Sequence, residues 1–504
     1  MMSRSIDAEY GQCFLLPPSL EEWVGPEHPA RFVRDFVDGL DLDWLGAERG
    51  ETAEAGRPHY APRLLLCLWL YGYMERIRSP RALERACRNH MGFIWLSGML
   101  TPDHNTLWRF WKAHKGGLKE VFRQSVRVAA ALELVEMVVH CVDGTKIASA
   151  ASKRRALHRG DLEALLASLD ERLSSYMETV DESGTREESE GGYGLPDELR
   201  DAAARKAKIA EALERLDIEG RARVLPGDPD ARMMRGSGRT EWSYNAQAVV
   251  DKANGFVVAS AVTSDENDRR QLVPMLEETV NTLGETAETT LADGGYNSNE
   301  QLGAAHAKGY NVLVNSHGQE KRGGTHYPAS RFVYDRGQDV YVCPQGAPLP
   351  YEYTDDNNGK PRRVYRCRRF AECPVRAQCS AARRGRTIKR DLHADAVEEH
   401  LTRRETPENK TLLRERGAVI ERIFGAIKHN EGFRRWTVRG IGNANAQWDL
   451  ICTAWNLKLL HRLVCAKPTH RSTPNPHPDP TPRRTRKQIR NRSAILPAAP
   501  IPAA

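Results

Sequence analysis

The stretch that most constrains the fold of this chain is residues 135–146, a mainly apolar and β-branched run that leads to Asp143. The run is too short for a buried helix of ordinary length, and it gives way to Gly144 and Thr145. We therefore expect a central strand with Asp143 at its end. A carboxylate in this position is either a turn residue or a metal ligand held on a rigid element.

Composition excludes several classes of protein. The 504 residues are 40% hydrophobic, which is typical of a globular protein with several domains. The longest apolar run, residues 64–74, is about half the length that spans a bilayer, and the N-terminus has no signal pattern. We expect a cytoplasmic protein without a membrane partner. Ten cysteines in so long a chain are too few for a disulfide framework, so reduced thiols are expected.

The distribution of charge indicates a polyanionic partner. The formal net charge is +7, and the basic residues concentrate in residues 322–390 and in the C-terminal tail. Such clustering is typical of proteins that bind nucleic acid. The tail, residues 466–504, is Pro-rich and basic, and we expect it to be disordered.

The first part of the chain, residues 1–134, is predicted to be a separate helical domain. Apolar residues recur at helical spacing in three stretches, residues 30–40, 63–77 and 118–134.

Between these stretches, a helix over residues 81–89, a Gly-containing turn and a capped helix over residues 107–114 suit a helix-turn-helix. Arg109 and Lys112 on the second helix are candidates for DNA contact. The alternative is a plain helix pair in which they are solvated.

The middle of the chain changes period twice. Residues 154–222 contain two stretches of helical period around an acidic, Gly-rich loop, which predicts an inserted helical hairpin that serves as a spacer or dimer arm. The sequence next predicts a β-hairpin (residues 242–263) and a helix (268–283). A strand that ends on Asp293 (289–292), a helix (297–309) and a last strand (310–315) follow. This is the order of an RNase H-like α/β domain, in which Asp143 and Asp293 would lie side by side.

Residues 316–391 are polar, Arg-rich and strand-like, and they contain four cysteines: Cys343, Cys367, Cys373 and Cys379. Four reduced thiols this close in sequence can surround Zn²⁺, or they can remain buried or unpaired. Arg383, Arg384 and Arg386 would lie near phosphates, or would form a solvated basic face.

A long amphipathic helix follows, with Glu421 among apolar residues and with Arg422 and Lys428 in reach of a phosphate backbone. A last helix, residues 445–463, should cover the sheet.

Together these segments resemble the DDE transposases of bacterial insertion sequences, from about Gln12 to Leu463. The resemblance is carried by residues 143–146 (Asp-Gly-Thr-Lys), 292–298, 420–428, 432–435 and 452–457. Glu421 and Lys428 match the Glu-x6-Lys part of the family signature. The Tyr and Arg that precede the Glu in that signature are Arg414 and Gly417 here.

The resemblance implies an α/β fold: an RNase H-like catalytic core (residues 135–315 and 392–465), an all-α N-terminal domain that binds DNA ends, the helical hairpin and the Cys-rich basic insertion. It also implies two Mg²⁺ or Mn²⁺ ions per active site, with Asp143 bridging both and Asp293 and Glu421 each completing one side. Lys428 and Arg422 would position phosphates. The competing second ligand is Asp268, which the pattern places at a helix start as a cap.

The implied activity is metal-dependent cleavage and strand transfer at the ends of an insertion sequence. The implied partner is double-stranded DNA, both the inverted-repeat ends and the target, bound by a nucleoid-associated homodimer. A metal-dependent nuclease without strand transfer would use the same three carboxylates. A non-catalytic DNA-binding regulator would leave them without a role.

Overall fold

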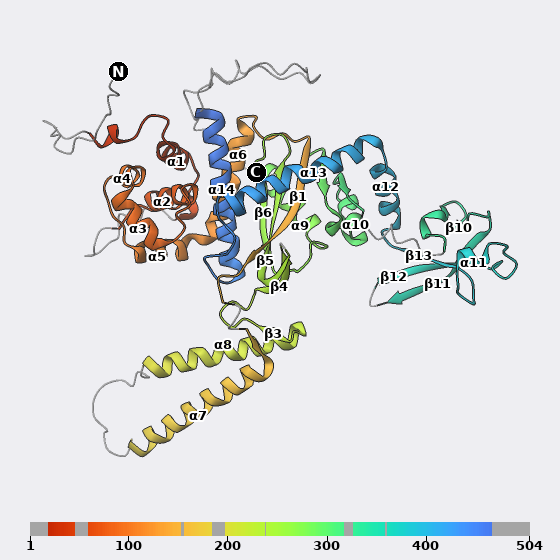
Figure 1. Cartoon of the computed structure of the whole chain (residues 1–504), viewed down its shortest axis with the longest axis horizontal. Coiled ribbons are helices and arrows are strands. Elements are labelled where there is room, and N and C mark those ends of the chain that lie inside the picture. Colours follow the sequence, from red (N-terminus) through yellow and green to blue (C-terminus); the bar gives the residue numbers. More distant parts are fainter. Residues whose placement is uncertain are drawn as a thin grey trace, which may run out of the picture.

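The structure is a computed structural model that describes residues 19–45, 59–152, 156–183, 197–236, 238–316, 326–357 and 360–465. The chain forms a group of N-terminal helices beside a central sheet, with a helical hairpin and a small β-module extending away from the sheet (Figure 1). The expected disordered tail, residues 466–504, lies outside the described residues, as do residues 154–155 and 184–196 of the expected hairpin. None of the described helices combines the length and apolar character that a membrane span requires.

The three predicted stretches of helical period are helices. The N-terminal helices are α1 (Pro29–Asp38), α2 (Pro62–Met74), α3 (Pro80–Asn89), α4 (Met91–Leu96), α5 (His104–His114) and α6 (Leu118–Ala131). Helix α2 is buried over most of its circumference, as its uniformly apolar sequence dictates.

The predicted Gly-containing turn between α3 and α5 is wrong in part, because α4 lies within it. Phe93 and Trp95 of α4 are buried, and this apolar burial supports a short helix. The helix stops before Gly98, whose φ of 59° suits a helix end.

The central sheet contains β1 (Val139–Ala148), β4 (Arg232–Gly236), β5 (Arg239–Asp251), β6 (Val257–Thr263), β7 (Thr289–Ala292) and β8 (Val312–Val314). The order is β4-β5-β1-β7-β8, with β6 also paired to β5. Strand β1 is antiparallel to β5 and parallel to β7, and β7 is parallel to β8. The predicted hairpin and strands are thus present, and β4, which was not predicted, pairs with β5 of that hairpin.

The expectation that Asp143 ends its strand is wrong. Strand β1 continues to Ala148, because the long strand β5 pairs with it over that whole length, with Gly144 opposite Gln247 and Lys146 opposite Asn245. Cross-strand pairing outweighs the weak strand preference of Gly and Lys.

Five of the described helices, all from the second half of the chain, pack around the central sheet. They are α9 (Leu272–Leu283), α10 (Asn299–Ala307), α12 (Ala394–Arg404), α13 (Pro407–Gly425) and α14 (Ile441–Cys465). Helix α13 packs on β1 and β7, α9 on β5 and β6, and α14 between β6 and helices α2 and α6. One continuous hydrophobic core therefore joins the N-terminal helices to the sheet.

The helical hairpin consists of α7 (Arg159–Ser183) and α8 (Asp197–Glu219), closed at its base by β2 (Leu157–His158) and β3 (Arg223–Val224). A small apolar cluster that includes Leu162, Leu169 and Leu216 holds the two helices together.

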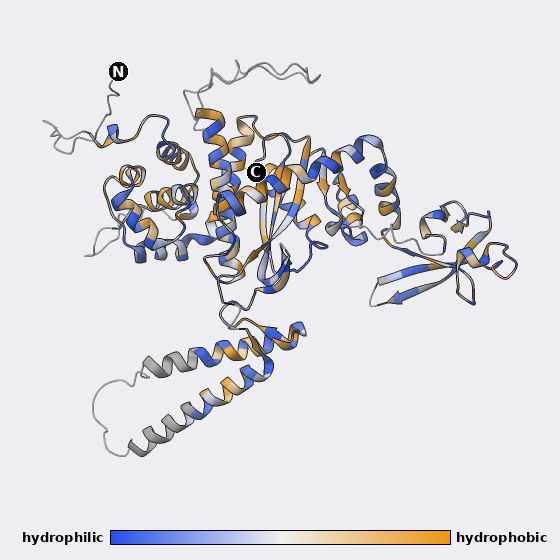
Figure 2. Ribbon diagram, in the orientation of Figure 1, coloured by the Kyte–Doolittle hydropathy of each residue, from blue (hydrophilic) through white to orange (hydrophobic). Residues whose placement is uncertain are grey.

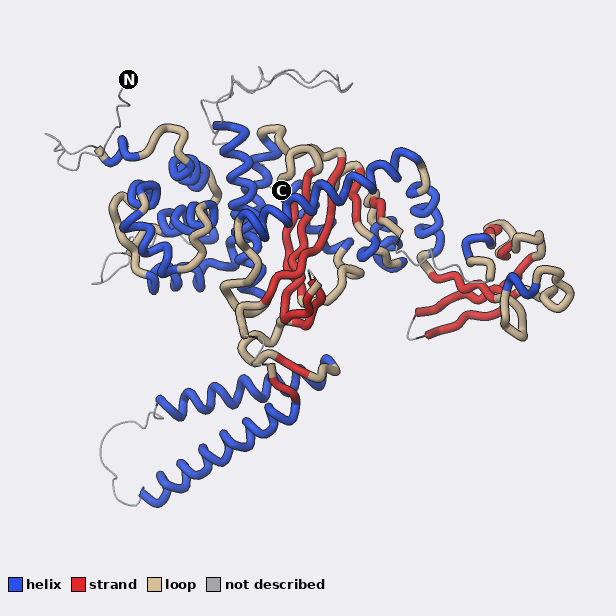
Figure 3. Tube along the Cα trace, viewed as in Figure 1, coloured by secondary structure: helices blue, strands red, loops and turns tan. Residues whose placement is uncertain are grey.

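The Cys-rich segment forms a separate small sheet in the order β13-β12-β11-β10-β9 (Figure 3). Its elements are β9 (Val333–Asp335), β10 (Val340–Val342), β11 (Pro348–Asn357), β12 (Lys360–Arg366), α11 (Arg376–Cys379) and β13 (Thr387–Asp391). Strands β11 and β12 carry mainly hydrophilic residues, whereas the central sheet is rich in hydrophobic ones (Figure 2).

Candidate active site

The register of β1 and β7 brings Asp143 and Asp293 together. Val142 pairs with Ala292, the last residue of β7, so the two aspartates follow the last paired residues of adjacent parallel strands. Burial raises the pKa of Asp143 to about 6, against the opposing charge of Arg416 and with a further contribution from the Asp293 carboxylate. The two carboxylates are therefore close enough to repel each other.

Asp293 is held by the turn that follows it. Its Oδ1 accepts a hydrogen bond of 2.8 Å from the backbone N–H of Gly295, in the 3-10 turn Gly294–Tyr296 (η5). A Cβ at position 295 would lie 2.9 Å from Asp293 Oδ1 and 3.6 Å from Asp268 Oδ2. Gly295 thus leaves room for both carboxylates, and these distances place Asp268 beside Asp293.

Asp268 belongs to this site, so the prediction that it caps a helix is wrong. Helix α9 begins at Leu272, four residues later. The Asp268 carboxylate instead accepts hydrogen bonds from Asn245 Nδ2 at 2.6 Å and Gln247 Nε2 at 2.7 Å, and it pairs with Lys146 Nζ at 3.2 Å. A signal existed in the sequence: Asn245 and Gln247 alternate with alanines in β5, and both are buried polar residues, which need hydrogen-bond partners.

Glu421 lies on α13, the helix that packs over β1 and β7. Its side chain is exposed, and it reaches back over Gly417, where a Cβ would lie 3.3 Å from Glu421 Oε1. The Gly that replaces the expected Arg therefore provides space for this carboxylate. In the described part of the chain, no three His, Cys, Asp or Glu side chains form a group arranged to hold a metal ion.

Two cations from the C-terminal helices face Asp143. Arg416 of α13 is buried, and its Nη1 lies 3.2 Å from Asp143 Oδ2. Lys428 lies in a π-helical turn (η8, Ala426–Asn430) that continues α13. Burial lowers the pKa of Lys428, the charge of Lys146 lowers it further, and Asp143 opposes both. Lys428 was predicted, whereas Arg416 was missed, although its spacing of four residues from buried Ile420 places it on the inner face of the helix.

The other predicted DNA contacts lie at the surface. Arg109 and Lys112 are exposed on α5, whose Phe110 and Trp111 are buried. Arg422 is exposed on α13.

The arginines of the Cys-rich segment differ among themselves. Arg383 and Arg384 are exposed, whereas Arg386 is half-buried and lies 5.4 Å from the centre of the Phe332 ring.

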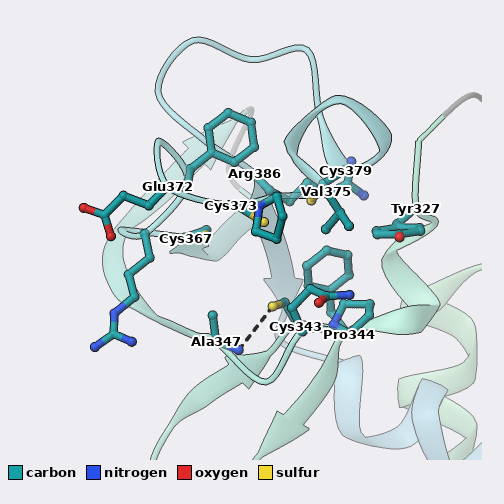
Figure 4. Close-up of a pocket in the computed structure, with 15 residues that line it drawn as sticks. Tyr327, Cys343, Pro344, Ala347, Cys367, Glu372, Cys373, Val375, Cys379 and Arg386 are labelled. Atoms are coloured by element: carbon teal, nitrogen blue, oxygen red, sulfur yellow. Dashed lines mark hydrogen bonds between the residues drawn. The ribbon is translucent and has the colours of Figure 1, made fainter.

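The four predicted zinc ligands, Cys343, Cys367, Cys373 and Cys379, line one cavity of about 210 Å³ in the small β-module (Figure 4). Burial is the main cause that raises the pKa of Cys367 and of Cys379.

Comparison with known families identifies the class of protein. Residues 18–113 match the family described as Transposase domain (DUF772), and residues 342–461 match the family described as Transposase DDE domain. Two separate regions of the chain are thus similar to transposase domains. The two matches together indicate a DDE transposase of an insertion sequence, which confirms the resemblance seen in the sequence. The comparison with curated proteins found no match.

Proposed function

We propose that this transposase cleaves DNA strands at the ends of its insertion sequence and transfers them to target DNA, with Asp143, Asp293 and Glu421 as ligands of divalent cations. One observation carries the proposal: the β1–β7 register sets Asp143 and Asp293 side by side beneath the helix that bears Glu421. An antiparallel β6-β5-β1 unit continued by parallel β7 and β8 is the strand arrangement of an RNase H-like core, which we propose for residues 135–315 and 392–465.

The donor set fits the proposed metal. Carboxylate oxygens are the ligands that Mg²⁺ and Mn²⁺ prefer, and two carboxylates that repel each other gain from a cation between them. When bound, the two cations would supply Lewis-acid stabilisation of the attacking and leaving oxygens.

The remaining side chains have positioning roles. Arg416 orients Asp143 through its contact of 3.2 Å, and the hydrogen bonds from Asn245 and Gln247 fix the Asp268 carboxylate next to Asp293. Lys428, which lies near Asp143, would bind a phosphate of the scissile strand, and exposed Arg422 would contact the backbone farther along.

We further propose that the partner is double-stranded DNA, both the inverted-repeat ends and the target, bound by a nucleoid-associated homodimer. Arg109 and Lys112 of α5 would contact the ends, and Arg383, Arg384 and Arg386 would contact phosphates.

The test compares Asp143→Asn, Asp293→Asn and Glu421→Gln with the matched control Glu415→Gln, an exposed residue of the same helix that pairs with Lys252. Each of the three site variants should bind DNA ends as the wild type does. Each should lose Mg²⁺-dependent nicking and strand transfer by about a thousandfold or more, because the carboxylates act as a unit. Glu415→Gln should remain active.

Gel assays of nicking and of strand joining on DNA with the element's ends give the readout. Asp268→Asn should be milder, because Asp268 is not among the proposed ligands. If Asp293→Asn nicks near the wild-type rate, the wrong aspartate has been assigned. Wild-type protein that nicks but never joins strands would instead be a metal-dependent nuclease.

A further inference from the structure

The small β-module has a limited core of buried residues. Cys367 and Cys379 are part of this core, and Cys343 packs against it. The loop between β12 and β13 contains a single helical turn, α11. Small domains of this kind commonly need a disulfide or a metal to stay folded.

The cysteines come from separate parts of the module and meet at one place. Cys343 follows β10, Cys367 follows β12, and Cys373 and Cys379 lie before and within α11. All four line the same cavity, together with Phe332 and Phe370 (Figure 4).

Residues 343–347 form a tight turn, and two of its backbone N–H groups point toward Cys343. The N–H of Ala347 donates to Cys343 Sγ at 3.3 Å, and the N–H of Gly346 donates to the Cys343 carbonyl at 2.8 Å. Gly346 has a φ of 75°, which a side chain would disfavour. An N–H directed at a sulfur stabilises a thiolate, the form of cysteine that binds metal.

We propose that Cys343, Cys367, Cys373 and Cys379 bind one structural Zn²⁺ that fixes the loops of this module. Four thiolates favour tetrahedral Zn²⁺ over Mg²⁺ or Ca²⁺, which prefer oxygen ligands. The described residues contain no ready-assembled set of three ligands, so binding rotates the cysteine side chains inward, to sulfur–sulfur distances of about 3.8 Å given Zn–S bonds of about 2.3 Å. Each thiol releases its proton to solvent when it binds.

Exposed arginines lie close to the cysteines in the chain. Arg368 and Arg369 directly follow Cys367, and Arg383 and Arg384 lie between Cys379 and Gly385. A cation bound by the four sulfurs would fix the backbone at Cys367 and at Cys379. The arginines that follow these cysteines would then have more restricted positions.

The first experiment is elemental analysis of the purified full-length protein. We expect about one zinc per chain. In the Cys373→Ser variant the zinc content should fall at least about fivefold. The matched control is Cys465→Ser, at the end of α14, which should keep its zinc.

The second experiment does not depend on the folding of a variant. Wild-type protein stripped with a chelator and reloaded with Co²⁺ should show the strong thiolate charge-transfer absorption of a tetrahedral sulfur site. Limited proteolysis should cut residues 367–386 roughly tenfold faster in the stripped protein, whereas cleavage of the central sheet should not change.

Protein without stoichiometric zinc would overturn the proposal if Co²⁺ also gives no such absorption. A count of two disulfides among the four cysteines in freshly purified protein would overturn it as well. None of these readouts depends on DNA cleavage, so this inference can fail while the proposed function stands.

Discussion

The carboxylate site of the central sheet and the thiol cluster of the β-module position their functional groups in different ways. Asp143 and Asp293 are aligned by backbone pairing between two buried strands, inside the largest core of the described structure. Three of the four cysteines lie in loops and Cys379 ends the short helix α11, and Cys367 and Cys379 are themselves part of the small core of the module. We therefore expect that the carboxylates can be replaced without loss of the fold, whereas removal of the thiols should weaken the small core to which they belong.

The largest expected effect comes from overfilling the sheet at Gly144. In a Gly144→Ala variant the added Cβ would lie 2.2 Å from Gln247 Nε2 and 2.6 Å from Asp268 Oδ1. Neither neighbour can move freely, because the two residues are hydrogen-bonded to each other. We expect a loss of about 2–3 kcal/mol in the free energy of unfolding, measured by urea denaturation.

The matched control is Gly425→Ala at the end of α13, where an added Cβ meets nothing within 4 Å. It should change the free energy of unfolding by less than about 1 kcal/mol. If Gly144→Ala is as stable as this control, the rigidity attributed to the sheet site is wrong.

A smaller and sharper effect is expected at Gly417, where stability and activity should move in opposite directions. Gly417→Ala should stabilise α13 by about 0.5–1 kcal/mol, because Ala favours the helix. The new Cβ would lie 3.3 Å from Glu421 Oε1, so the carboxylate has to shift by a few tenths of an ångström. We expect Mg²⁺-dependent nicking to fall roughly tenfold, since a metal site tolerates little displacement of a ligand.

Gly425→Ala again serves as the control, because it adds the same methyl group to the same helix away from Glu421. If Gly417→Ala nicks DNA at the same rate as Gly425→Ala, Glu421 is not part of the catalytic unit.

Sequence patterns predicted much of the fold because the relevant signals are local. The helical stretches were found from apolar period and the strand 289–292 from a short apolar run, and the order of strands was sufficient to place Asp143 beside Asp293. The length of β1 was not predictable, since it depends on the partner strand β5.

The role of Asp268 was missed for a similar reason. Asp near a helix start is usually a cap, and only the sheet shows that Asn245 and Gln247 of β5 and Lys146 of β1 converge on it. Arg416 was missed because its partner, Asp143, lies 273 residues earlier in the chain.

The smallest expected effect concerns which cations of the β-module bind phosphate. Arg363 and Lys389 are paired with Asp339 and Asp355, so much of their charge is already neutralised. Arg383 and Arg384 are exposed and form no described ion pair. We expect the double variant Arg383→Ala/Arg384→Ala to weaken binding about equally on element ends and on random DNA.

The slope of the logarithm of affinity against the logarithm of salt concentration should fall by up to about 2 units, because each lost phosphate contact removes about 0.9. The control variant Arg363→Ala/Lys389→Ala removes two charges of the same sign from the same module and should change the slope by less than half as much. Fluorescence anisotropy across a salt series measures both. If the loss is confined to element ends, or if the two double variants give the same slope, then these arginines do not contact phosphates in the proposed sequence-independent way.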